Sequence, residues 1–207
     1  MFVLTADQKR STRHGDRVPA ALAALEAALG SGRDSGVALP FERTVGDEIQ
    51  GALSSPGAAV RAVTELVRLG DWRVGLGVGA VDTPLPDSTR AASGPAFLAA
   101  REAVDRAASS PTDLRVVHAD GAGHYGGADR ARHAESALWL LTVLLRRRTP
   151  EGWEIVDMAD TGLTGRDIAD RLDISPSAVS QRLTRAALHE GRRGAELAEA
   201  LLAEADA

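Results

Sequence analysis

The spacing of apolar residues in the first third of the chain predicts a helix among three strands. Phe2–Ala6 is a short apolar run typical of a buried strand, and residues 17–29 repeat apolar side chains at helical spacing. Two strand-like runs follow, Val37–Val45 and Glu48–Leu53. They are separated by a Gly-Asp pair at positions 46–47, which is typical of a tight hairpin turn.

The same pattern continues through residue 118 and indicates the class of fold. Pro56 opens a helix that stops at Gly70, and residues 72–81 alternate as a strand with several glycines. A helix over 95–108 and a strand over 114–118 follow. The six elements up to residue 81 follow the order strand, helix, strand, strand, helix, strand, which is that of ferredoxin-like and polymerase-palm domains. We therefore expect an α+β fold with a βαββαβ sheet domain.

The second half of the chain has a purely helical pattern. Residues 134–148 and 151–159 predict two helices, and the rest of the chain to its end also has helical spacing. We therefore expect two domains, an α+β sheet domain over 1–125 and an all-α domain over 132–207.

Residues 164–186, TGRDIADRLDISPSAVSQRLTRA, have the pattern of a helix-turn-helix. Thr164 can cap the first helix, and Ser175-Pro176 is a strong start signal for the second. The small side chain of Ala169 would allow the two helices to cross closely. A second helix placed in the major groove would offer polar side chains to base edges and phosphates. The candidate DNA-binding residues are Ser175, Ser177, Ser180, Gln181, Thr184 and Arg185. A helical corner with no role in DNA binding remains the alternative.

Charge and composition limit the classes of function. The net charge is −5, so a nucleic-acid site would have to be local, and residues 161–193 carry six Arg against four acidic residues. The absence of Cys excludes disulfides and thiolate chemistry. The longest apolar run, at 136–145, is well short of the ~20 residues that a membrane span needs. We therefore expect a cytoplasmic protein without a membrane partner.

Three carboxylates form a candidate metal site in the first domain. In a ferredoxin-like sheet the first and third strands are antiparallel neighbours, which would place Asp7 beside Asp47 and Glu48. Carboxylates so close together repel one another unless a cation lies among them. Mg²⁺ or Mn²⁺ held there could clamp the phosphates of a nucleotide. The alternative is ordinary, because Gly-Asp is a common turn and Asp is common at strand ends.

Three segments resemble nucleotide-condensing enzymes. RTVGDEIQGAL at 43–53 resembles the hairpin of class III nucleotidyl cyclases and of GGDEF diguanylate cyclases, and the segments at 72–81 and 93–107 resemble the strand and helix that follow. The resemblance implies that Arg43 lies near a nucleotide base and Arg101 near phosphate. The cyclase position for an Asn that orients the ribose holds Phe97, which argues against cyclisation.

A closer resemblance is to the SatD family of small bacterial proteins. It rests on ADQKRSTR at 6–13, GDEIQ at 46–50 and GPAFLAARE at 94–102. The apolar pair that usually follows the first Asp in that family is replaced here by Gln8 and Lys9. The resemblance covers most of the chain and implies the architecture rather than the activity.

These observations favour a DNA-binding transcriptional regulator. Its cyclase-like domain would bind a nucleotide or mediate dimerisation, and a homodimer is expected because such domains usually read two-fold sites. The alternative is a metal-dependent nucleotidyl cyclase or nucleotidyltransferase that acts on ATP or GTP. A scaffold that binds only another protein is a third hypothesis.

Overall fold

The computed structural model describes residues 1–30, 32–119 and 126–207, and these form a mixed α+β fold. Its sheet has five strands in the order β2-β3-β1-β4-β5. β1 is antiparallel to both β3 and β4, whereas β5 runs parallel to β4 at the edge. The strands are β1 (Phe2–Gln8), β2 (Val37–Arg43), β3 (Glu48–Leu53), β4 (Trp72–Val78) and β5 (Leu114–His118). The expected pairing of the first and third strands is therefore present.

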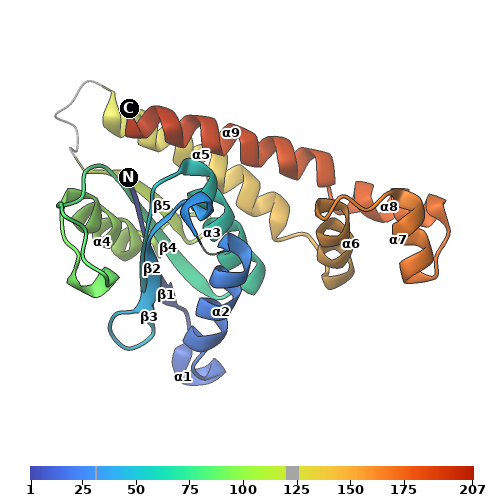
Figure 1. Cartoon of the computed structure of the whole chain (residues 1–207), viewed down its shortest axis with the longest axis horizontal. Coiled ribbons are helices and arrows are strands. Elements are labelled where there is room, and N and C mark those ends of the chain that lie inside the picture. Colours follow the sequence, from blue (N-terminus) through green and yellow to red (C-terminus); the bar gives the residue numbers. More distant parts are fainter. Residues whose placement is uncertain (31, 120–125) are drawn as a thin grey trace.

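The two faces of the sheet are covered by different helices (Figure 1). Phe2 and Leu4 of β1 belong to a large apolar cluster with α2 (Val18–Leu29) and α3 (Pro56–Leu69), whereas Val3 between them packs in a smaller cluster with α4 (Pro95–Ala107). This alternation follows from the two-residue repeat of a strand. The short elements are α1 (Ser11–His14), η1 (Arg33–Ser35) and η2 (Thr89–Ala91).

α4 lies unusually close to β4 because two glycines of that strand face it. A Cβ atom on Gly75 would lie 2.2 Å from the backbone nitrogen of Val104, and one on Gly77 would lie 2.2 Å from the carbonyl oxygen of Ala96. Both distances are far below van der Waals contact, so neither position has room for a side chain. The two glycines therefore allow the backbone of α4 to approach that of β4 closely.

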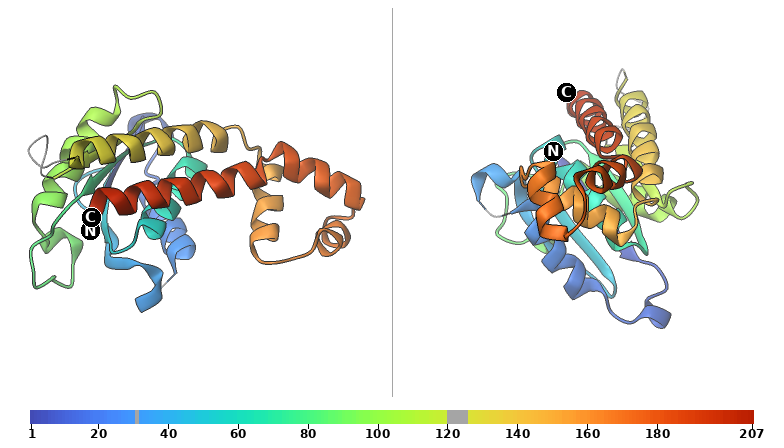
Figure 2. Two further views of the ribbon diagram at one scale, coloured as in Figure 1. Left: turned by 90° about the horizontal axis from the view of Figure 1, so that it is seen from above. Right: turned by 90° about the vertical axis from the view of Figure 1, so that its right-hand side faces the viewer.

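Two long helices from the second half of the chain pack onto the sheet core. α5 (Gly127–Leu145) and α9 (Leu188–Asp206) lie side by side and antiparallel, as Figure 2 shows. Gly194 of α9 faces Leu141 of α5, because a Cβ atom there would lie 3.3 Å from the Leu141 side chain. Leu138 and Leu202 are fully buried in the same cluster as β1. The expected domain 132–207 therefore contains helices that share a core with the expected domain 1–125. Residues 120–125, at the end of the expected first domain, lie outside the described residues.

The remaining helices form a separate small core. α6 (Pro150–Asp160), α7 (Gly165–Leu172) and α8 (Pro176–Arg185) project from one end of the molecule (Figure 1). Ile155, Ile168 and Val179 are buried among them, and Leu188 at the start of α9 joins them. We refer to residues 150–187 as the helical module. Among the described residues, no helix is long and apolar enough to cross a membrane.

Several elements end at other residues than the sequence predicted. β2 ends at Arg43 rather than at Val45, whose side chain is exposed in the hairpin turn. The helix expected at 134–148 begins at Gly127, because Ala131 and Ala134 extend its buried stripe. It ends at Leu145, before the chain turns toward the start of α6, where the Thr149 side chain accepts a hydrogen bond from the Gly152 backbone nitrogen.

Candidate functional site

The acidic residues of the hairpin lie together at one end of the sheet. Asp7 is directly opposite Glu48 in the ladder of β1 and β3, and the backbone nitrogen of Gln8 donates to the carbonyl oxygen of Asp47 at 3.2 Å. Burial raises the pKa of Asp7, and the negative charges of Asp47 and Glu48 raise it further. The structure therefore brings these three residues together, as the sequence predicted.

Asp7 and Glu48 are each paired with an arginine. Arg73 of β4, which is opposite Asp7 in the sheet, donates to its carboxylate at 3.1 Å. The Glu48 side chain is buried and accepts two hydrogen bonds from the Arg101 guanidinium, of which the Nη2–Oε1 bond measures 2.8 Å. The Thr44 hydroxyl also donates to Glu48. We refer to Asp7, Glu48, Arg73 and Arg101 as the ion-pair cluster.

This pairing gives Arg101 a partner that the sequence did not indicate. The hydrogen bonds to Glu48 raise the pKa of the Arg101 guanidinium and fix it over the start of β3. Its direct partner is therefore a carboxylate of the same chain, whereas the sequence placed it near a phosphate. Within the described residues no group of three or more His, Asp or Glu side chains is arranged to hold a metal ion. A Mg²⁺ or Mn²⁺ ion that used Asp7 or Glu48 would have to compete with Arg73 or Arg101 for these carboxylates.

The other two positions taken from the cyclase resemblance have partners outside this cluster. Arg43 at the end of β2 pairs with Asp16 at 2.5 Å and donates to the carbonyl oxygen of Gly46 at 3.2 Å. Phe97 of α4 is only 8% exposed and packs against Val3 and Leu39. The position of the cyclase Asn is thus part of the apolar core under α4.

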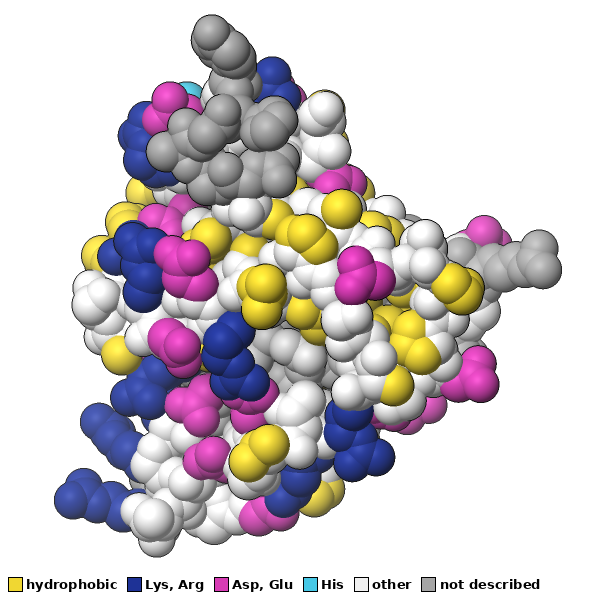
Figure 3. Space-filling model, turned by 90° about the vertical axis from the view of Figure 1, so that its left-hand side faces the viewer, with side chains coloured by type: hydrophobic (Ala, Val, Ile, Leu, Met, Phe, Trp, Pro, Cys, Tyr) yellow, Lys and Arg dark blue, Asp and Glu magenta, His cyan; other side chains and the backbone are white. Residues whose placement is uncertain are grey.

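The face of the molecule on the α4 side has a mixed charge. Acidic and basic side chains lie next to one another there, among scattered apolar ones (Figure 3). Glu102 and Arg106 of α4, for example, are joined by a 2.6 Å ion pair. This face has the charge distribution of an ordinary protein surface.

The helical module contains a two-helix corner whose ends are capped by the residues that the sequence indicated. Thr164 and Asp167 form a capping box at the start of α7, and the Ser175 hydroxyl accepts from the backbone nitrogen of Ala178 at the start of α8. Between the helices Asp173 adopts the left-handed conformation with φ 51°. Ile168, Ala169 and Val179 are buried between α7, α8 and α6. The helix starts and the turn at 173–174 agree with the sequence prediction.

The candidate DNA-binding side chains all face away from this small core. All six are exposed: Ser175, Ser177, Ser180, Gln181, Thr184 and Arg185. Ser175 also has its structural role as the cap of α8. Of the nearby arginines, Arg192 is held by Asp160 at 2.7 Å, whereas Arg166, Arg171 and Arg193 are exposed.

Two groups of contacts were missed from the sequence. The first is the pairing of Asp7 with Arg73. The strand order could have indicated it, because both residues lie at the same end of neighbouring strands. The second is the stacking of Arg68 and Arg148 on Trp153. Arg68 lies 85 positions from the tryptophan and Arg148 lies just before the helix that carries it, and no local sequence pattern predicts either contact. Comparison with known proteins gives no match to a family model, to a curated protein or to a solved structure.

Proposed function

We propose that the protein is a DNA-binding transcriptional regulator in which α8 is the recognition helix. The observation that carries the proposal is the corner formed by α7 and α8, with its capped starts, small Ala169 at the crossing and polar outer face. A helix with exposed Ser, Gln, Thr and Arg side chains can hydrogen-bond to base edges in the major groove.

Exposed arginines around the corner support contact with the DNA backbone. Arg166 and Arg171 lie on α7, Arg185 ends α8 and Arg193 lies on the next helix, and each can reach solvent. Contacts to phosphate provide most of the sequence-independent affinity and make it depend on salt. Because residues 161–193 carry six Arg against four acidic residues, their excess of positive charge is small, and the chain as a whole has a net charge of −5. We therefore expect modest nonspecific binding.

The sheet domain is proposed to sense a nucleotide or to form the dimer. The strand order β2-β3-β1-β4 is the one that a ferredoxin-like or palm domain produces, which supports the resemblance to cyclases and to the SatD family. Phe97 in place of the cyclase Asn, together with the engagement of Arg101 by Glu48, favours binding without turnover. A dimer would present two copies of α8 to a two-fold DNA site.

The DNA-binding proposal is tested by selecting sites from a random duplex pool and measuring affinity by fluorescence anisotropy. Arg185→Ala and Gln181→Ala are expected to weaken binding to the selected site by about tenfold or more, as the loss of a good base contact would. Arg13→Ala is the matched control, because Arg13 is exposed on α1 at the far side of the molecule (Figure 1). Selection of no sequence, or equal losses in all three variants, would contradict the proposal.

The sensing proposal is tested by thermal shift with ATP, GTP and cyclic nucleotides, each with and without Mg²⁺ or Mn²⁺. A ligand at about 100 times its dissociation constant adds ~2.7 kcal/mol to the free energy of unfolding, which is easily seen as a higher melting temperature. A shift that Asp47→Ala removes would support a nucleotide site at the hairpin. If no nucleotide shifts the melting temperature, the remaining role for the sheet domain is dimerisation, which sedimentation measures directly.

One observation favours the alternative, a nucleotidyl cyclase or nucleotidyltransferase. Asp7 and Glu48 are opposite one another at the sheet end, which is where the resemblance places catalytic carboxylates. Incubation with ATP or GTP and Mn²⁺ would then give a cyclic or transferred product, and Asp47→Ala would abolish it. The pairing of both carboxylates with arginine makes this the weaker proposal.

A further inference from the structure

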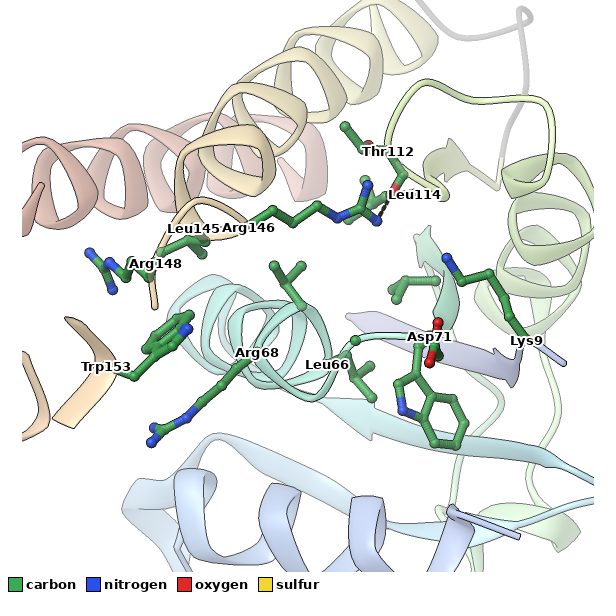
Figure 4. Close-up of a pocket in the computed structure, with 14 residues that line it drawn as sticks. Lys9, Leu66, Arg68, Asp71, Thr112, Leu114, Leu145, Arg146, Arg148 and Trp153 are labelled. Carbon is green, nitrogen blue, oxygen red and sulfur yellow. Dashed lines mark hydrogen bonds between the residues drawn. The ribbon is translucent and has the colours of Figure 1, made fainter. Parts of the chain in front are cut away.

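A cavity of about 400 Å³ lies where the sheet domain meets the helical module. Figure 4 shows its lining, which comes from the ends of β1, α3 and α5 and from the starts of β4, β5 and α6. Leu66, Leu114 and Leu145 form its apolar part. Its volume is within the range of small-molecule sites, and junctions between structural units are common positions for such sites.

The lining is rich in positive charge. It includes Lys9, Arg68, Arg146 and Arg148, whereas Asp71 is its single carboxylate among the described residues. Asp113 and Asp157, which are outside the lining, neutralise part of this charge through ion pairs with Lys9 at 2.9 Å and with Arg68 at 2.6 Å. Lys9 is the only lysine of the chain. The cations remain in excess, so the cavity favours an anionic occupant.

Two of these cations converge at one end of the cavity. Lys9 extends from the end of β1 and Arg146 from the end of α5 (Figure 4). Both donate to the same oxygen of Asp113, at 2.9 and 3.2 Å. An ammonium has three donors and a guanidinium has five, so each side chain has more donors than these contacts use. The pair therefore offers a fork of further N–H groups to an oxyanion.

At the other end, a cation without a carboxylate partner borders the cavity. Arg148 donates to the carbonyl oxygens of Ala186 and Ala187, at 2.8 and 3.4 Å, and its guanidinium lies 4.7 Å from the centre of the Trp153 ring. Within the described residues it forms no ion pair. Burial lowers the pKa of this guanidinium and Arg68 lowers it further, whereas Asp160 and Asp157 only partly oppose the shift. A negative charge in the cavity would relieve that cost.

We propose that this cavity binds a small phosphorylated molecule with an apolar portion. The phosphate would accept hydrogen bonds from Lys9 and Arg146, and the apolar portion would lie along Leu66 and Leu145 toward Trp153. Because Trp153 belongs to α6, such a ligand would touch both the sheet domain and the helical module. The proposal does not rest on DNA binding, and its site is distinct from the hairpin with Asp47.

The test is calorimetric titration of the full chain with phenyl phosphate, inorganic phosphate and phenol. Phenyl phosphate is expected to bind more tightly than either of its parts, because it fills both ends of the site. Arg146→Gln and Lys9→Gln are each expected to weaken its binding by about tenfold or more, as the loss of a charge-assisted hydrogen bond does.

Arg147→Gln is the matched control, since Arg147 is the exposed neighbour of Arg146 and does not line the cavity. It should bind phenyl phosphate like the wild type, and so should Asp47→Ala. If Arg146→Gln does not fold, Lys9→Gln decides, because it changes the phosphate end from the opposite side. Absence of saturable binding to the wild type, or equal weakening in Arg147→Gln, would overturn the proposal.

Discussion

The close contact between α4 and β4 makes Gly75→Ala a severe change. The new Cβ would lie 2.2 Å from the backbone nitrogen of Val104 and 2.6 Å from the carbonyl oxygen of Ala100, whereas ordinary contact begins at 3.4 Å. Both atoms belong to a helix backbone, so no side-chain rotation can relieve the clash. The whole of α4 would have to move outward by about 1 Å, which loosens its packing along the strand.

Overpacking of a core typically costs about 1–3 kcal/mol, and we expect the upper end here because a helix must move. With a urea dependence of about 3 kcal/mol/M for a chain of this size, the unfolding midpoint should fall by about 1 M. The assay is urea unfolding followed by tryptophan fluorescence, since Trp72 is buried in the sheet core.

Gly165→Ala is the control, because a Cβ at that first position of α7 meets no atom within 4 Å. It should change the free energy of unfolding by less than about 1 kcal/mol, and in the stabilising direction, since Ala is the better helix former. If Gly75→Ala unfolded at the same urea concentration as this control, the proposed steric role of the β4 glycines would be refuted.

Three further predictions concern the ion-pair cluster and the helical module. Burial raises the pKa of Asp7 above 3.8, so on raising the pH the unfolded chain loses the Asp7 proton before the folded chain does. As the pH rises from below 3.8 through the raised value, the wild type should therefore lose stability relative to Asp7→Asn. Paired urea titrations across that pH range measure this difference. Ser175→Ala removes the cap of α8 and should cost about 1 kcal/mol in thermal unfolding, whereas Ser180→Ala, an exposed site within the same helix, should be nearly neutral. Asp173→Gly should raise the stability of the module by about 1 kcal/mol, because glycine adopts φ 51° without steric cost; an unchanged or lower melting temperature would argue against strain at this turn.

The features that the sequence predicted well depend on residues close together along the chain. Ser175-Pro176 marks the start of α8 because a cap and its helix are neighbours, and Gly46 marks a turn because few other residues adopt its positive φ. The meeting of Asp7 with Glu48 was also predictable, since the order of the strands fixes which ends lie together.

The features that the sequence could not predict depend on which partner an apolar or charged side chain meets. The apolar residues of α5 and α9 recur along one side of each helix, which shows that each helix buries one face. The pattern does not show that this face packs on the core of the sheet. Arg101 lies 53 positions from Glu48, and its spacing is equally consistent with a phosphate partner. Packing and ion pairing at such separations depend on the whole fold.

The chain enters and leaves the helical module at almost the same place. Arg148, just before α6, donates to the carbonyl oxygen of Ala187, just before α9. The module is therefore an insertion into the loop of an antiparallel helical hairpin, and α5 and α9 would still pair if residues 149–187 were replaced by a short linker. Excision at these two points, rather than truncation near 125–132, would yield a sheet domain that keeps both of its covering helices.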